Sequence, residues 1–127
     1  MMTTTRARKN LGESGERVAA LFLEARGYKI LARNFRTRVG EIDLIAEDAD
    51  GLAFVEVRAR RGDARSVSPE ESLTPRKRAR LITVAQEFLA MHACYADRAW
   101  RIDLVALVLD RAGRIARMEV IKGAVES

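Results

Sequence analysis

The chain contains very few of the residues that build disulfides or histidine-based sites. It has one cysteine, Cys94, and one histidine, His92, among 127 residues. A single cysteine excludes an intramolecular disulfide and fits a reducing compartment. With no second histidine or cysteine at ligand spacing, His92 is interpreted as a core or helix-end residue rather than as a metal ligand or a general base.

Long apolar runs are also missing. No stretch approaches the roughly 20 apolar residues that a membrane helix needs, and residues 1–9 lack the apolar centre of a signal peptide. By elimination, the sequence predicts a soluble, cytoplasmic protein with no membrane contact. A Walker loop, a dinucleotide fingerprint and a Ser/His/Asp order are absent too, so none of these chemistries is predicted.

What is present is enough apolar material for one folded domain. Hydrophobic residues make up 48% of the chain, and 127 residues suffice for a real core. We expect a flexible basic tail over residues 1–10, a single domain over 11–122 and a frayed tail over 123–127. Hydrophobic periodicity and turn residues predict the order helix, three strands, helix, and one or two strands.

The predicted elements have the following bounds. Helices are expected at 12–26 and from Thr74 to His92 or Tyr95, with Thr74 as N-cap and Pro75 in the first turn. Strands are expected at 28–35, 41–47, 53–58, 100–109 and 114–121, and a loop at 59–75.

Acidic residues stand in both strands of the predicted central hairpin, where carboxylates are unusual. Alternation puts Glu41, Asp43, Ile45 and Glu47 on one face of the first strand, and Phe54, Glu56 and Arg58 on one face of the second. Asp43 lies on its first strand and Glu56 on its second, followed by Arg58. A two-residue loop at 49–50 would set Asp43 opposite Glu56, and one at 50–51 would set it opposite Arg58. Both registers leave the three side chains on one face, because side chains alternate along strands.

Two converging carboxylates need a cation between them or a solvated surface. Mg²⁺ takes one or two protein carboxylates and binds phosphate oxygens, which is the equipment for phosphodiester hydrolysis. The alternative is a charged hairpin face in solvent. Glu16, at the edge of the first helix, is either a third acidic group or a residue favoured by the helix dipole. Asp103, on a similar strand, is a lesser rival for the metal role.

The positive charge is concentrated in one segment. Residues 58–80 hold eight basic and three acidic residues, which accounts for the whole net charge of +5. Such clustering favours phosphate contacts with nucleic acid, although a solvated helix end remains the alternative. The predicted nucleic-acid-binding residues are Arg60, Arg61, Arg65, Arg76, Lys77, Arg78 and Arg80.

Several motifs in order resemble the small bacterial YraN family. They include Gly15-Glu16, Gly40-Glu41-Ile42-Asp43, Phe54-Val55-Glu56-Val57-Arg58, Thr74-Pro75-Arg76-Lys77 and Arg101-Ile102-Asp103. That family resembles restriction-endonuclease-like nucleases and archaeal-type Holliday junction resolvases. The resemblance implies an α/β fold with a restriction-endonuclease-like αβββαβ core, a mixed sheet flanked by helices, and a Mg²⁺ (or Mn²⁺) site.

The resemblance also implies roles for individual residues. Asp43 corresponds to the metal-binding aspartate, Glu56 to the acidic residue of the Glu-x-Lys element, and Glu16 to the first-helix glutamate that completes the cluster. The chain departs from the motif at Arg58, which stands where lysine is usual. Arginine keeps the charge but cannot serve as a neutral base, so this change bears on turnover more than on binding.

Together these observations predict a metal-dependent nuclease acting on DNA rather than RNA, either selective for structures such as junctions or flaps or only weakly specific. Asp43, Glu56 and Glu16 would hold the metal, and Arg58 would contact the scissile phosphate. The first alternative is a non-catalytic nucleic-acid-binding protein on a nuclease-like fold. The second is an assembly protein whose basic face meets an acidic protein. A homodimer would suit paired cuts on a junction.

Overall fold

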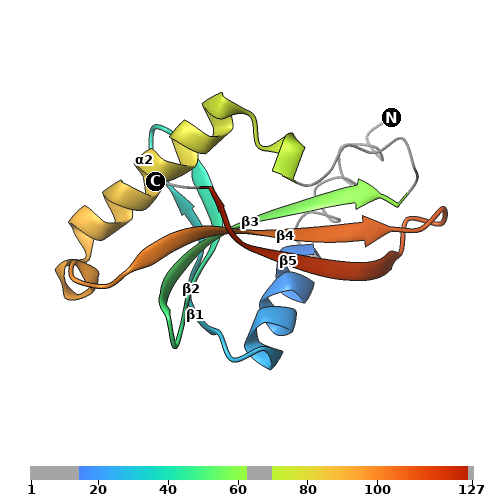
Figure 1. Ribbon diagram of the computed structural model, residues 1–127, viewed down its shortest axis with the longest axis horizontal. Helices are drawn as coiled ribbons and strands as arrows, with labels where there is room; N and C mark the ends of the chain where they lie inside the picture. The colour runs from blue at the N-terminus through green and yellow to red at the C-terminus, as the bar shows by residue number, and fades with distance from the viewer. Residues whose placement is uncertain (1–14, 63–69, 126–127) are drawn as a thin grey trace.

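The computed structural model describes residues 15–62 and 70–125, which form a mixed five-stranded sheet with helices on both faces (Figure 1). Its strands, in the spatial order β1-β2-β3-β4-β5, are β1 (Lys29–Arg36), β2 (Glu41–Asp48), β3 (Gly51–Arg61), β4 (Trp100–Leu109) and β5 (Ile115–Val125). β3 and β4 run parallel, and the other neighbours are antiparallel. The predicted α/β class with a mixed sheet is confirmed.

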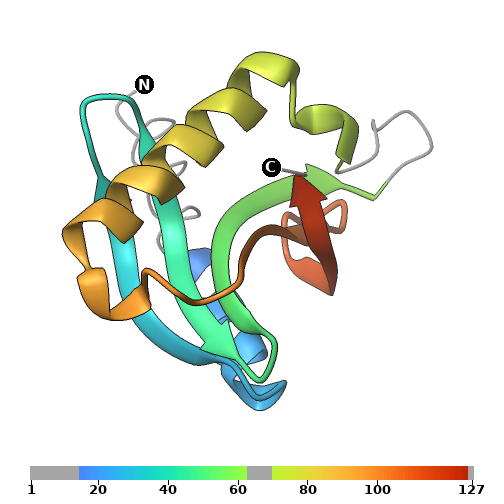
Figure 2. The same cartoon turned by 60° about the vertical axis from the view of Figure 1, so that its left-hand side comes forward.

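The two helices pack on opposite faces of the sheet, as Figure 2 shows from a second side. The first helix covers residues 15–25 of the described chain and buries Ala19, Ala20 and Leu23. Helix α2 (Pro75–Met91) buries Leu81, Val84, Ala85 and Phe88 against the other face. Short 3₁₀ turns, η1 (Glu70–Ser72) and η2 (Ala93–Tyr95), flank α2. Within residues 15–62 and 70–125, no helix is long and apolar enough to cross a membrane.

The helix ends follow the predicted capping residues. The Thr74 side chain accepts a hydrogen bond from the Lys77 backbone N–H at 3.3 Å, and Pro75 occupies the first turn, as expected. The first helix ends at Gly27, whose φ of 93° is a conformation that glycine adopts without penalty. Helices and strands follow one another along the chain in the predicted order, which is helix, three strands, helix and two strands.

The β2–β3 hairpin has the first of the two predicted registers. Asp48 pairs with Gly51, which leaves a two-residue loop at 49–50. The Asp48 side chain closes the turn by accepting from the Asp50 backbone N–H at 2.9 Å. A Cβ atom on Gly51 would lie 2.3 Å from the Ala99 carbonyl oxygen, and its φ is 140°. Only glycine fits where the hairpin meets the start of β4.

Two strands are longer than predicted. β3 continues through Arg61, and its last four residues pair with Ala106–Leu109 of β4, so the predicted loop at 59–75 begins inside a strand. β5 continues to Val125, which pairs with Ile102, so the expected frayed tail starts inside paired structure. In both cases the pairing with β4 satisfies the backbone, which local turn chemistry could not foretell. The predicted basic tail and Arg65 lie outside the described residues.

Candidate metal centre

The candidate site forms where β2 and β3 separate. Their pairing runs from Asp48 and Gly51 to Leu44 and Val55. At the next position the Asp43 carboxylate accepts a hydrogen bond from the Val57 backbone N–H at 2.8 Å. The side chain therefore replaces a backbone partner of β3, which places the carboxylate at the level of the sheet rather than wholly on one face.

The alternation of side chains along β2 is also interrupted at this point. Leu44 belongs to the core beneath the first helix, whereas Ile42 belongs to the core beneath α2. A regular strand would place these two side chains on one face. On β1, Asn34 lies between the partners of Leu44 and Ile42, and its φ of 52° is the only positive value at a non-glycine residue in the described chain. Backbone irregularity of this kind clusters at functional sites.

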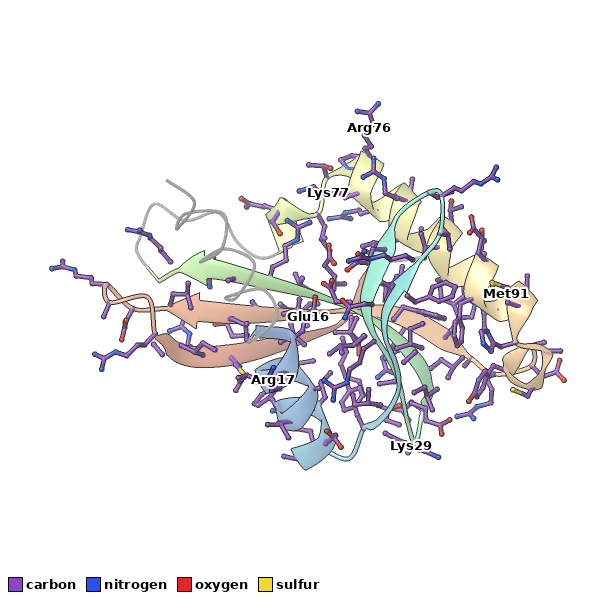
Figure 3. The ribbon with its side chains drawn as sticks, turned by 180° about the vertical axis from the view of Figure 1, so that it is seen from behind. Glu16, Arg17, Lys29, Arg76, Lys77 and Met91 are labelled. Carbon is purple, nitrogen blue, oxygen red and sulfur yellow. The ribbon has the colours of Figure 1, made fainter. Side chains whose placement is uncertain are left out.

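Three carboxylates converge beside this irregularity. Glu16, Glu41 and Asp43 each offer an oxygen atom, and these atoms lie within 4.8 Å of one another. Glu16, labelled in Figure 3, lies near the start of the first helix, and the other two residues lie on β2. The Glu41 carboxylate also accepts from the Arg36 Nε at 2.6 Å. Oxygen donors from separate elements at such spacing form a set that a hard divalent cation can use.

Glu56 and Arg58 lie next to this group. Glu56 lies close enough to Asp43 to raise the pKa of that carboxyl, and its own carboxylate accepts from the Arg58 guanidinium at 3.1 Å. The side chains of Glu56 and Arg58 are 16% and 30% exposed, so the ion pair is partly shielded from water. The predicted convergence of Asp43, Glu56 and Arg58 is therefore observed, with Glu41 joining Glu16 and Asp43 in the tightest set.

The pKa values of the cluster indicate that its carboxylates have too little positive charge near them. Burial, followed by the hydrogen bond and the charge of Glu56, raises the pKa of Asp43 to about 8, against the lowering effect of the Val57 N–H. Burial and the nearby Asp43 also raise the pKa of Glu16, although a hydrogen bond from Asn34 lowers it. Carboxylates crowded without enough compensating cation give such shifts. The donor set thus fits a divalent ion.

Asp103, the lesser rival for a metal role, is already saturated. It is fully buried and accepts from Arg101, the Tyr28 hydroxyl and the Gly123 backbone N–H, at 3.0, 3.2 and 2.9 Å respectively. A carboxylate with these donors has little capacity left for a cation. The structure therefore gives Asp103 a role in holding β4 and β5 together.

The predicted nucleic-acid-binding residues occupy different surroundings. Arg60 pairs with Glu119 of β5 at 3.6 Å, and the Arg78 Nε donates to the Leu73 carbonyl at 2.7 Å. Arg76 is exposed at the start of α2, and Figure 3 labels it there beside Lys77. These residues therefore include structural contacts as well as exposed charge, and they do not all serve one surface.

Arg80 links the basic helix to the acidic site. A Cβ atom on Gly40 would lie 2.7 Å from the Arg80 Cδ and 2.9 Å from its Cγ, so the arginine stem crosses Gly40 closely. Gly40 directly precedes Glu41. The absence of a side chain at Gly40 therefore allows the first turns of α2 to pack beside the start of β2.

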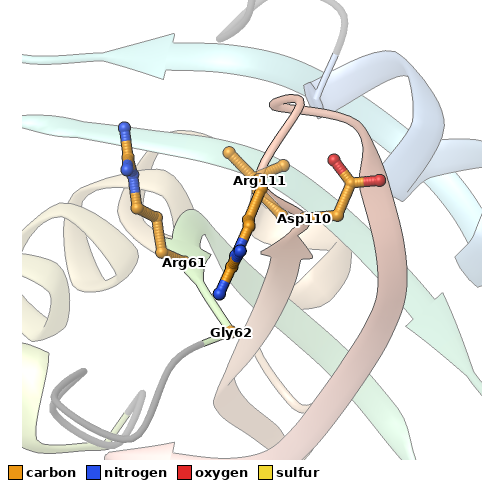
Figure 4. Close-up of a pocket in the computed structure, with 5 residues that line it drawn as sticks. Arg61, Gly62, Asp110 and Arg111 are labelled. Atoms are coloured by element: carbon orange, nitrogen blue, oxygen red, sulfur yellow. The ribbon is translucent and has the colours of Figure 1, made fainter.

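Arg61 lies at the far end of β3. It lines a cavity of about 760 Å³ together with Gly62, Leu109, Asp110 and Arg111 (Figure 4). The Gly62 backbone N–H donates to the Leu109 carbonyl at 3.1 Å, which holds the ends of β3 and β4 together below it. Two arginines and one aspartate make this cavity basic.

Comparison with known proteins identifies the family. The model of the uncharacterised protein family UPF0102 matches residues 15–107. The chain belongs to UPF0102. This is the YraN family that the motifs indicated. A UPF0102 protein of Roseiflexus castenholzii is 45% identical over 122 residues, covering 96% of this chain and 98% of the relative. One from Moorella thermoacetica is 45% identical over 123 residues, covering 97% and 99%.

Two residues of this UPF0102 site, Glu41 and Asn34, were not predicted as functional from the sequence. Glu41 was recognised as sharing a face with Asp43 but was not predicted as a ligand, although its spacing of two residues was the available signal. Asn34, part of an Arg33-Asn34 motif of the family resemblance, was assigned no role, since its importance depends on a positive φ and on its interaction with Glu16. The matched range of 15–107 contains both residues.

The raised pKa of Asp43 predicts a pH-dependent stability of the metal-free UPF0102 chain. The carboxyl has a pKa near 3.9 when unfolded and about 8 in the fold. The folded state therefore binds the proton more tightly, and stability falls as pH rises from about 4 to 8. We expect Asp43→Asn in EDTA to come closest to the native protein near pH 4 and to exceed it by a margin that grows toward pH 8, where it should reach about 1–3 kcal/mol.

Thermal unfolding at a series of pH values, with Asp50→Asn as a control, checks this expectation. Asp50 is exposed in the hairpin turn, so its amide variant should follow the native profile. A divalent cation should restore the melting temperature of the native protein at pH 8 and leave that of Asp43→Asn unchanged. Identical pH profiles for the native protein and Asp43→Asn would contradict the assignment.

Proposed function

We propose that this UPF0102 protein is a metal-dependent nuclease that hydrolyses phosphodiester bonds in DNA. The observation that carries the proposal is the convergence of carboxylate oxygens from Glu16, Glu41 and Asp43 within 4.8 Å, beside a partly buried Glu56–Arg58 ion pair. A purely structural set of acids would be expected to carry a matching set of cations. Here Asp43 and Glu16 instead have raised pKa values.

Each residue has a role in this proposal. Asp43 and Glu16, with Glu41 and Glu56 beside them, would hold Mg²⁺ or Mn²⁺, and that ion would supply a bound water of lowered pKa and positive charge near the leaving oxygen. Arg58 orients the scissile phosphate. Its Nε is buried without a hydrogen-bond partner among the described residues, so Glu56 does not satisfy the whole guanidinium.

The order of the helices and strands supports the nuclease proposal. The first helix, a three-stranded antiparallel unit, α2 and a strand parallel to β3 follow one another along the chain, which is the αβββαβ order that the family resemblance implies and which supports the proposal. We place the DNA backbone between the acidic cluster and the first turns of α2, because Arg80 crosses Gly40 next to Glu41 and Arg76 is exposed nearby in the sequence. Arg and Lys contacts to phosphate supply affinity but little sequence preference.

One observation favours a second function, that of a non-catalytic DNA-binding protein. The Arg58 guanidinium is already paired with Glu56 at 3.1 Å, so an internal cation partly neutralises the cluster. Arginine holds its proton across the working pH range, which removes any mechanism that needs a neutral base at this position. In that case the basic residues would bind DNA while the carboxylates left it intact.

Cleavage assays separate the two functions. We expect the native protein to cut labelled DNA with Mg²⁺ or Mn²⁺ and not with EDTA, and to prefer four-way junctions or flaps over linear duplex and single strands. Arg58→Lys should keep or raise the rate, since an ammonium also contacts phosphate and is a more compact cation. DNA binding without cleavage by either protein would instead support the binding function.

A further inference from the structure

β5 forms an edge of the sheet along one side of the molecule, drawn in red in Figures 1 and 2. It pairs with β4 on its inner side, and no other strand of the described chain pairs with its outer side. At 11 residues it is among the longest strands of the sheet. An edge of this length presents backbone N–H and C=O groups that can template pairing with another strand.

The regular part of β5 has a charge pattern suited to such pairing. Arg117 to Ile121 pair with β4 without interruption, and register shifts lie on both sides. Arg117 and Glu119 are joined by an ion pair of 3.0 Å and have side chains 62% and 36% exposed. Met118 and Val120 are partly buried against the core beneath the first helix. The charged and apolar residues therefore alternate between the two faces.

Symmetry restricts how this strand can meet a copy of itself. A two-fold axis normal to the sheet pairs only residues of the same face, so it must pass through a residue position. An axis at Arg117 sets two arginines opposite each other, and an axis at Glu119 sets two glutamates opposite. An axis at Met118 sets Arg117 opposite Glu119 of the second copy, twice over. Opposite charges directly across a strand pair are favourable, and like charges are not.

We propose that β5 pairs antiparallel with β5 of a second copy of this chain, centred on Met118, so that one sheet continues through a homodimer. Each Arg117 then has a Glu119 on either side, one in its own strand and one in the partner. The flanking Arg114 and Lys122 already have acidic neighbours, Asp110 and Asp48 respectively. Their mutual repulsion across the dimer is therefore reduced. This proposal is independent of the nuclease proposal.

Analytical ultracentrifugation of charge-reversal variants tests the pairing. The native chain should sediment as a dimer at about 10–100 µM, and Arg117→Glu or Glu119→Arg alone should raise the dimer dissociation constant by at least about tenfold. An equimolar mixture of the two single variants should dimerise again. In that mixture every Arg117–Glu119 contact across the interface is again between opposite charges.

Two controls separate pairing from folding. Arg111→Glu makes the same charge change at an exposed residue of the β4–β5 turn and should leave the dimer intact. Thermal melts of all variants verify that each is folded, which matters for Glu119→Arg because Glu119 also pairs with Arg60. A monomeric native chain would overturn the proposal and leave the edge to another partner. A dimer that survives Arg117→Glu, or folded single variants that do not dimerise when mixed, would also overturn it.

Discussion

Changing Asp43 to alanine is expected to abolish metal-dependent cleavage, with a rate at least about a thousandfold lower, or about 4 kcal/mol in the activation barrier. Asp43 is the residue that connects the whole site, because it belongs to the convergent set with Glu16 and Glu41 and its pKa is raised by the neighbouring Glu56. Its loss would remove a ligand and the group that holds the other acids in register. Glu16→Ala and Glu41→Ala should cost less, about 10–100-fold.

The matched control for this series is Asp50→Ala. Asp50 is a carboxylate of the same hairpin, but it lies exposed in the turn and contacts Lys122 at 3.4 Å rather than the cluster. We expect its cleavage rate to stay within about twofold of the native rate, since an exposed ion pair contributes little. Retained cleavage in a folded Asp43→Ala protein would exclude this site as the catalytic centre, whatever activity the native protein showed.

The sequence predicted the hairpin site because its evidence is local. Asp48 and Gly51 mark a tight turn, and once a two-residue loop is assumed, strand alternation brings Asp43 and Glu56 together. The convergence of these acids with Arg58 follows from residues fewer than twenty positions apart, whereas the choice between the two predicted registers came from the structure. The capped start of α2 at Thr74 and Pro75 was predictable for the same reason.

Strict alternation along β2 was the assumption that failed. It placed Ile45 on the face of Glu41 and Asp43, whereas Ile45 packs in the core beneath α2 and Asp43 lies with Glu16 of the first helix. The strand turns between these positions because the Asp43 side chain, not its backbone, bonds to β3. A side chain that replaces a ladder partner leaves no mark in a hydrophobic pattern.

The basic segment shows what a count of charges can and cannot predict. The excess of positive charge lies in residues 58–80, but the count could not tell a surface charge from a structural one. Arg60 is paired with Glu119 from a strand almost sixty positions away, and Arg80 lies across Gly40. Such contacts depend on long-range packing, whereas Arg76 lies exposed at the start of α2 as a surface charge.

The second large effect is expected at Arg101, whose replacement by methionine should destabilise the fold by about 3–5 kcal/mol. Arg101 donates to the fully buried Asp103 at 3.0 Å and to Asp48 at 2.8 Å. Its hydrogen bond is the largest cause of a lowered pKa at Asp48. Methionine keeps much of the side-chain volume, so the cost would come from leaving the Asp103 charge buried without its cation. Urea unfolding at pH 7 measures the change.

Two further variants assign that cost to the buried charge. Lys122→Met also removes a cation from Asp48, but its side chain is 49% exposed, so the loss should be below about 1 kcal/mol. Arg101→Met combined with Asp103→Asn should recover part of the stability, because an amide needs no counter-ion. Equal losses at Arg101 and Lys122 would contradict the network. If the folded double variant still responds to divalent ions, Asp103 is structural and the metal role belongs to the carboxylates around Asp43.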